Sequence, residues 1–156
     1  MFRLLVIALC FVATSVAAED KYVGYYYPQV NSTEVFDRQI RDAGAANKRV
    51  RVDFLTNLTK AQLAAPESPR FVFFAKGESS SELILVGLDD DVFSSIYRAR
   101  AVMAQMTSNI RQSPIFVDQG LQFVATFYDL LQMLEFDSLV ISDGESWAHK
   151  VEFKRN

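Results

Sequence analysis

The sequence predicts a single domain of the α/β (α+β) class, in which helices pack on a mixed β-sheet. Segments with the two-residue period of strands are interleaved with segments that have the period of helices. Two pairs of strand-like runs are joined by short polar loops, which indicates hairpins. No repeat, low-complexity tract or linker divides residues 19–156, and a chain of this length buries about two-thirds of its unfolded surface.

The N-terminus, residues 1–18, is predicted to be a cleaved signal peptide. Arg3 is followed by the apolar run Leu4–Val16, which is too short to span a bilayer. The run ends in small residues of the kind that signal peptidase recognises, so cleavage is expected before Glu19. Cys10 is preceded by leucine, whereas a lipoprotein signal has a small residue there. We therefore expect a periplasmic or secreted protein without a lipid anchor.

The chain that remains after cleavage is slightly acidic and contains no cysteine. Residues 1–18 hold one basic and no acidic residue, so their removal changes the net charge from −3 to −4. No basic cluster suits nucleic acid, and no second apolar stretch is long enough to cross a membrane. An exported chain of this length needs no disulfide, which suits a bacterial periplasm. No cofactor is expected.

Four elements are expected before residue 66. The aromatic run Tyr22–Tyr27, closed by a proline, is typical of a strand. Asn31 and Glu34 form a capping-box pattern, which predicts a helix from that point. Arg49–Leu55 alternates between polar and apolar residues, as in a strand with one solvated face, and Thr59–Ala65 fits a short helix. The apolar face of the first helix would consist of Phe36, Ile40 and Ala43, with Gly44 near its end.

The rest of the chain is expected to contain two hairpins and two helices. The apolar runs Phe71–Ala75 and Leu83–Val86 are typical of strands covered on both faces, and the polar loop between them predicts an antiparallel hairpin. Leu139–Ile141 and Trp147–Phe153 are joined around Asp-Gly, a strong hairpin signal. The long helix is predicted over residues 90–110, with a buried stripe of Phe93, Ile96, Ala99, Met103, Met106 and Ile110. The second helix would bury Phe123, Phe127, Leu130, Leu131 and Leu134.

The predicted order up to residue 110, strand–helix–strand–helix–strand–strand–helix, resembles the thioredoxin fold. The stretch SPRFVFFAKGE is similar to the proline, strand and tight turn of that fold's hairpin half, with Pro69 at the place of its cis-proline. The resemblance implies that the last helix and hairpin form a C-terminal extension. Redox members carry a cysteine pair where this chain reads YPQVNS, so thiol exchange is not expected. Another two-layer α/β arrangement remains the alternative.

His149 is the only histidine and lies in the last expected strand, where alternation turns it toward the core with Trp147 and Phe153. A lone imidazole acts as a general base when a carboxylate orients it beside a group to activate. A hydrogen-bonded structural histidine is the alternative, and no G-x-S-x-G motif is present. Nearby polar residues, of types that a hairpin turn uses anyway, are Ser142, Asp143 and Ser146.

Asp89, Asp90 and Asp91 form the densest acidic cluster. Three carboxylates can hold Mg²⁺ or Ca²⁺, but the run lacks the spacing and the glycine of a calcium loop. The same residues begin the predicted long helix, where aspartate caps free N–H groups and favours the positive end of the helix dipole. The arginines off the apolar stripe, which suit a solvated face or an anionic ligand, are Arg98, Arg100 and Arg111.

The tyrosine run before Pro28 is the expected binding surface. Alternation in a strand would turn Tyr25 and Tyr27 to one face and Tyr26 to the other, so at least one ring would face solvent or a cleft. Such rings stack on sugars, bases or peptides. The alternative is an aromatic strand that packs on its neighbours. The candidate ligand-binding residues are therefore Tyr25, Tyr27 and His149.

Several stretches, GYYYP, FVFFAKG, ILVGLDDD, YRARAVMAQMT, ATFYDLLQMLEF and SDGESWAHKVE, are similar to a family of small exported bacterial proteins without an established activity. Some members carry the label molybdopterin-guanine dinucleotide biosynthesis protein A, which implies transfer of GMP from GTP to molybdopterin. Such an enzyme needs a glycine-rich basic loop after its first strand to bind phosphates. Here that segment reads YPQVNSTE, so no catalytic residue is transferred from the label.

Two classes of function follow. The first, which we expect, is an exported non-catalytic binding or accessory domain that contacts a partner protein or small ligand through its aromatic N-terminal strand. The second is an enzyme, either a metal-assisted hydrolase or transferase with Asp89–Asp91 or a hydrolase with His149. A carboxylate and a hydroxyl beside His149 in an open cleft would favour the enzyme, whereas enclosure by core side chains would favour the binding domain.

Overall fold

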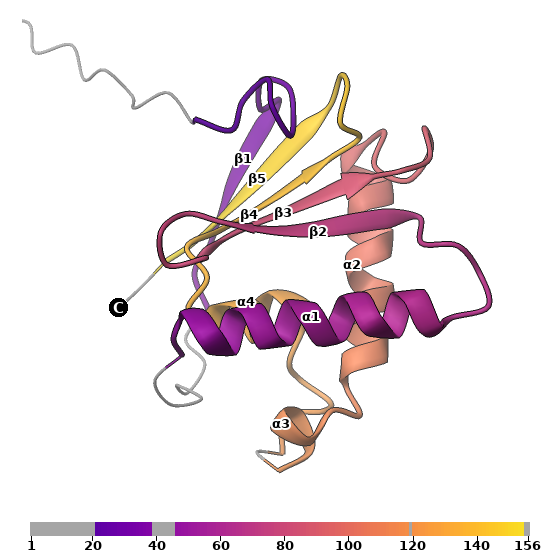
Figure 1. Ribbon diagram of the computed structural model, residues 1–156. Helices are drawn as coiled ribbons and strands as arrows, with labels where there is room; N and C mark the ends of the chain where they lie inside the picture. The colour runs from indigo at the N-terminus through magenta and orange to yellow at the C-terminus, as the bar shows by residue number, and fades with distance from the viewer. Residues whose placement is uncertain (1–20, 39–45, 119, 155–156) are drawn as a thin grey trace, which may run out of the picture.

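A computed structural model describes residues 21–38, 46–118 and 120–154. They form a five-stranded mixed sheet with helices, so the single-domain α/β class is confirmed (Figure 1). The strands are β1 (Ser32–Phe36), β2 (Phe71–Lys76), β3 (Glu82–Gly87), β4 (Ser138–Ser142) and β5 (Ala148–Phe153). The helices are α1 (Lys48–Ala64), α2 (Ile96–Ile110), the one-turn α3 (Pro114–Val117) and α4 (Phe127–Met133).

The sheet order is β1-β5-β4-β3-β2, so the first strand pairs with the last. β1 runs parallel to β5 and β3 runs parallel to β4, whereas the pairs β2/β3 and β4/β5 are antiparallel. The helices lie on one face of the sheet, and the segment before β1 packs on the other (Figure 1). β1 and β2 are therefore the edges of the sheet.

Both predicted hairpins are confirmed, because β2 pairs with β3 and β4 pairs with β5. In the β4–β5 turn, Gly144 adopts a φ of 85°, which favours glycine. Partial burial pushes the pKa of the Asp143 carboxyl upward, but hydrogen bonds from its own turn outweigh burial and hold that pKa below its usual value. The backbone N–H groups that donate to Asp143 Oδ1 belong to Glu145, Ser146 and Trp147.

The prediction of a strand followed by a helix at the start of the domain is wrong. Tyr22–Tyr27 forms turns with one isolated bridge between its second and last residues. Residues 32–36 form β1, and the Asn31 side chain accepts the N–H of Ala148, 117 residues away, at 2.8 Å. Pairing with β5 therefore outweighed the local capping pattern. Three residues of the expected helix lie outside the described ranges, namely Ile40, Ala43 and Gly44.

A single helix, α1, replaces the strand expected at Arg49–Leu55 and the short helix expected after it. The Asn47 side chain caps α1 by accepting the N–H of Val50 at 3.1 Å. Arg51 and Leu55, which lie four residues apart, are its buried residues. The alternating pattern spans too few residues to distinguish the two-residue period of a strand from the 3.6-residue period of a helix. The buried residues follow the helical period.

The long helix α2 begins later than expected. The Ser95 hydroxyl accepts the N–H of Arg98 at 3.4 Å and caps the helix. The acidic run Asp89–Asp91 lies in the turn before this cap, so the interpretation of these residues as helix caps is wrong. Within the described ranges, no helix is both long and apolar enough to span a membrane.

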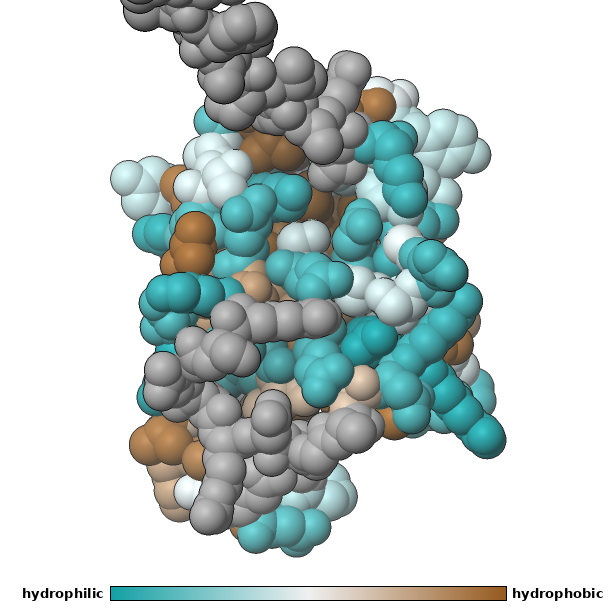
Figure 2. Space-filling view, turned by 90° about the vertical axis from the view of Figure 1, so that its left-hand side faces the viewer, coloured by the Kyte–Doolittle hydropathy of each residue, from teal (hydrophilic) through white to brown (hydrophobic). Residues whose placement is uncertain are grey.

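The later helix α4 is also shorter than expected. Thr126 and Asp129 form a capping box at its start. Phe123, which the sequence placed on its buried face, precedes the helix and is 81% exposed. Such exposed hydrophobic residues are scattered, and the side of the molecule shown in Figure 2 is mainly hydrophilic with small separate hydrophobic patches.

The thioredoxin-like element order is not observed. Up to residue 110 the order is strand, helix, strand, strand, helix. Among the described residues no peptide bond is cis, so the bond before Pro69 is trans. The α/β class therefore holds, while the resemblance to thioredoxin is unconfirmed.

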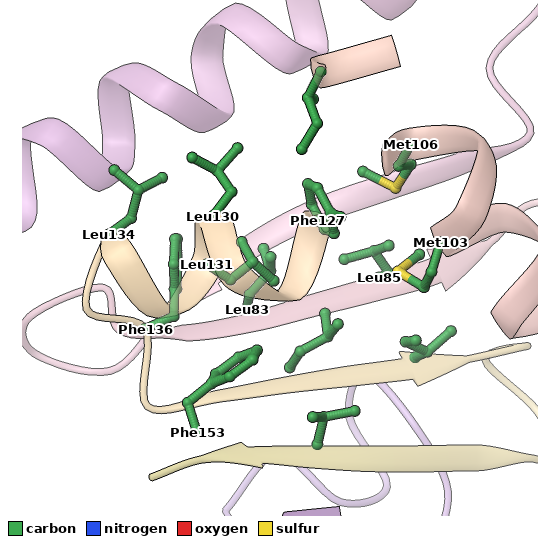
Figure 3. Packing of buried hydrophobic residues seen from close by; sticks show 14 of the residues in the cluster. Leu83, Leu85, Met103, Met106, Phe127, Leu130, Leu131, Leu134, Phe136 and Phe153 are labelled. Atoms are coloured by element: carbon green, nitrogen blue, oxygen red, sulfur yellow. The ribbon is translucent and has the colours of Figure 1, made fainter. Parts of the chain in front are cut away.

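The main core lies between the helices and one face of the sheet (Figure 3). β3, β4 and β5 contribute alternate residues, and α2 and α4 cover them. A smaller cluster on the opposite face is built around Tyr27, Ile84, Val140 and Ala148. The central strands β3 and β4 are therefore covered on both faces, as the run Leu83–Val86 predicted, whereas β2 at the edge is only half-buried. The main cluster includes Leu83, Leu85, Met103, Phe127, Leu131, Leu139, Ile141, Val151 and Phe153.

Candidate functional site

His149 lies on the sheet face that the helices cover and is only 3% exposed. Its ring stacks on Trp147 with a centroid separation of 6.2 Å. The register of β1 and β5 places Ser32 directly beside it, and Ser32 Oγ and His149 Nδ1 share a hydrogen bond of 2.8 Å. Glu34 faces the same side as Ser32 because it is two residues further along β1. Pairing of the first and last strands thus brings together a hydroxyl, an imidazole and a carboxylate.

The contact between Glu34 and His149 is electrostatic rather than a well-aligned hydrogen bond. Glu34 Oε1 lies 3.3 Å from His149 Nε2, which is within ion-pair distance. The same nitrogen is buried without a hydrogen bond of good geometry. Ser32 and Trp147 hold the ring in place beside the carboxylate.

Glu34 also connects the sheet to α2 and α4. Its Oε2 lies 3.3 Å from Arg100 Nη2. Tyr128 packs its ring on Phe36 at a centroid separation of 5.5 Å. Burial raises the pKa of Tyr128 to about 12, the negative charge of Glu34 adds to the effect, and Arg100 partly offsets it. The phenol therefore stays protonated at neutral pH, and its hydroxyl is able to donate a hydrogen bond.

A cavity of about 390 Å³ opens beside this network, between β1, α2 and the start of α4. Its charged and phenolic groups are Glu34, Arg100 and Tyr128, and neither Ser32 nor His149 lines it. Its volume falls in the range of pockets that hold small organic molecules. The apolar side of the cavity is formed by Val35, Phe36, Met103, Ala104 and Phe127.

The tyrosines expected to form the binding surface do not share a face. Tyr25 is 78% exposed, whereas Tyr27 is 2% exposed and belongs to the smaller core cluster, so its expected role in ligand binding is not supported. The Tyr26 ring lies 5.0 Å from that of Phe74. These contacts attach the segment to the sheet, because its rings cover the apolar face that the helices leave uncovered.

Two residues of the acidic run Asp89–Asp91 form ion pairs with arginines. Asp89 lies 3.5 Å from Arg70, and Asp91 lies 3.2 Å from Arg98. Among the described residues, no three His, Cys, Asp or Glu side chains come together in an arrangement that could hold a metal ion. The structure thus separates these carboxylates from the network around His149.

The polar residues near His149 in sequence serve the hairpin turn. The Ser142 hydroxyl donates to the Trp147 carbonyl at 2.7 Å, and the Ser146 hydroxyl donates to Asp143 at 2.8 Å. The partners that His149 does have, Ser32 and Glu34, were missed because their segment was interpreted as a helix. The signal that could have revealed them is the alternation of Ser32, Glu34 and Phe36 along one strand face.

No protein-family model, curated protein or solved structure matches the chain. Its function is therefore inferred from the geometry of these residues alone.

Proposed function

We propose that this chain is an exported, non-catalytic domain that binds a small amphipathic ligand in the cavity between β1, α2 and α4. The observation that carries the proposal is an apolar cavity with the Glu34–Arg100 pair and the Tyr128 hydroxyl at one side. Export is proposed from the apolar run Leu4–Val16. The cavity lining contains no glycine-rich backbone that would suit the phosphates of GTP.

The polar groups favour a ligand that carries a hydrogen-bond acceptor. Both oxygens of Glu34 already face cations or donors, one toward His149 and one toward Arg100. The Arg100 side chain is 60% exposed and contacts Glu34 through a single nitrogen, which leaves other guanidinium N–H groups for a ligand. The protonated Tyr128 hydroxyl is a further donor. A short aliphatic or aromatic carboxylate matches this combination.

The burial of His149 supports binding rather than catalysis. A general base must reach the proton that it removes, yet the His149 ring is buried against Trp147 and does not line the cavity, so it does not reach a ligand bound there. Its contacts suit a positioning role. The imidazole lies 3.3 Å from Glu34 Oε1, so it contacts one oxygen of the carboxylate whose other oxygen pairs with Arg100.

Octanoate is expected to bind the purified chain more tightly than octylamine, because the apolar parts are equal and only the carboxylate can pair with Arg100. The Arg100→Ala variant should weaken octanoate binding about tenfold. Titration followed by amide chemical shifts measures both affinities and shows whether residues around the cavity respond.

Arg49→Ala is the matched control for this titration, since it removes the same charge from the exposed face of α1. It should leave octanoate binding unchanged. Equal binding of octylamine, or equal loss in both arginine variants, would contradict the proposed site.

A second candidate function, acyl transfer at Ser32, is favoured by the 2.8 Å hydrogen bond between its hydroxyl and His149 Nδ1, with a carboxylate at the opposite ring nitrogen. An alkyl fluorophosphonate tests it by intact-mass measurement. In a reactive enzyme, Ser32 Oγ would bond to phosphorus as fluoride leaves, and His149 would take the hydroxyl proton. The binding proposal expects no adduct, whereas an adduct that Ser32→Ala abolishes would favour the enzyme.

A further inference from the structure

β1 is a sheet edge, and no described segment pairs with its outer backbone groups. It pairs with β5 on one side, and the sheet has no further described strand beyond it. The Lys154 N–H donates to the Phe36 carbonyl at 3.1 Å, so the backbone groups of Phe36 face β5. Because these groups alternate in direction along a strand, the N–H and C=O of Thr33 and Val35 point away from the sheet.

The proposed ligand cavity lies along this same edge. Glu34, Val35 and Phe36 all line it, although successive side chains of a strand point to opposite faces of a sheet. The lining thus follows β1 itself over three consecutive residues. Val35 is 62% exposed, and its outward backbone groups belong to a residue that also lines the cavity.

The two edges of the sheet differ in their protection. Edge strands are commonly shielded by proline, by lysine or by a covering helix. β2 is preceded by Pro69, ends in Lys76 and is packed against α1. β1 reads Ser-Thr-Glu-Val-Phe and contains neither proline nor lysine. The edge beside the cavity is thus the one whose sequence permits pairing with another strand.

We propose that the ligand is an extended polypeptide segment of a partner protein, which adds to the sheet as a strand beside β1. The inference rests on the proposed function, because one apolar side chain of the segment fills the cavity. An adjacent aspartate, glutamate or C-terminal carboxylate of the segment pairs with Arg100. A molecule confined to the cavity would leave the backbone groups of Thr33 and Val35 unused, whereas a peptide backbone satisfies them.

The test selects peptides from a phage-displayed library of short linear sequences on the purified full chain. Enriched peptides are expected to contain an apolar residue next to an acidic one, and binding of the synthetic peptides should slow hydrogen exchange at the amides of Thr33 and Val35. Failure to enrich any such peptide, or enrichment without protection of these amides, would overturn the proposal.

Proline variants separate backbone pairing from cavity binding. Val35→Pro and Thr33→Pro each remove one outward N–H without removing a bond to β5. Each should weaken peptide binding about tenfold. Thr33→Pro should also leave octanoate binding close to wild type. Thr33→Pro decides the matter if Val35→Pro does not fold, since Thr33 does not line the cavity.

The outcomes distinguish this inference from the proposed function. If octanoate binds but the proline variants retain full peptide affinity, the cavity stands and strand addition fails. If neither octanoate nor any peptide binds, the proposed function fails with it. A dimer of the wild-type chain that Thr33→Pro dissociates, or slow exchange of the Thr33 and Val35 amides before peptide is added, would assign the edge to this chain itself and overturn the partner segment.

Discussion

Replacing Arg51 with alanine is expected to lower the free energy of unfolding by about 3 kcal/mol. The residue is 4% exposed, and its guanidinium donates to backbone carbonyls from two distant segments. Nη1 donates to Leu134 at 3.1 Å and to Glu135 at 3.3 Å, at the end of α4. Nη2 donates to Ser79, in the β2–β3 loop, at 2.9 Å. The truncation leaves these carbonyls without a donor, and each buried unsatisfied group costs about 1–3 kcal/mol.

Urea unfolding at neutral pH measures the Arg51 effect, with Arg49→Ala as the matched control. Arg49 is on the same helix but is 90% exposed, so its loss should change the free energy of unfolding by less than about 0.5 kcal/mol. Arg51→Lys should be intermediate, because one ammonium group cannot reproduce the fork of guanidinium donors. Equal unfolding midpoints for the two alanine variants would show that Arg51 does not connect these segments.

Replacing Asp129 with alanine is the second large expected effect, again about 3 kcal/mol. The carboxylate is fully buried at the start of α4. Its Oδ2 accepts the Thr126 N–H at 2.6 Å and the Thr126 hydroxyl at 2.7 Å, and lies 3.0 Å from Arg38 Nη1. Alanine would remove the carboxylate's half of the capping box and the ion pair together. Because α4 carries Phe127 and Leu131 into the core, a loosened first turn would disturb the packing beside the cavity.

Asp129→Asn keeps the shape of the side chain and separates the two contributions. Its amide oxygen can still accept from Thr126, but the attraction of Arg38 to a full charge is lost, so the destabilisation should be smaller than for alanine. Asp53→Ala is the control, since Asp53 is exposed and pairs with Arg49 at 3.8 Å. Urea unfolding together with hydrogen exchange of α4 amides measures both effects. Unchanged exchange in α4 after Asp129→Ala would contradict the capping role.

Elements whose interactions are local were predictable from the sequence. The β4–β5 hairpin carries its own determinants, because Asp143 satisfies three successive N–H groups and Gly144 supplies the left-handed φ. The continuous apolar run of β3 predicted burial on both faces of the strand, and that prediction did not depend on which elements cover it. The buried stripe of α2 was also recognisable, since Ala99, Met103, Met106 and Ile110 repeat at helical spacing.

Elements that depend on distant partners were not predictable. The capping-box pattern at Asn31 is a valid helix start by local chemistry, yet its side chain bonds to Ala148 and its segment becomes β1. In the first half of α1, the alternation of valines competes with the four-residue spacing of Arg51 and Leu55. Neither ambiguity can be settled by neighbours in sequence, because the deciding contacts are made by α4 and β5.

The sequence by itself determined the α/β class, the two hairpins, the burial of His149 and the absence of a thiol from residues 19–156. Only the tertiary structure decided what surrounds that histidine and which surface is open. The physical reason is the pairing of the first strand with the last, which aligns Ser32 and Glu34 with His149, although Ser32 and His149 are 117 positions apart in sequence. A side chain's own pattern can direct it toward the core, but the groups that meet it there are set by strand register.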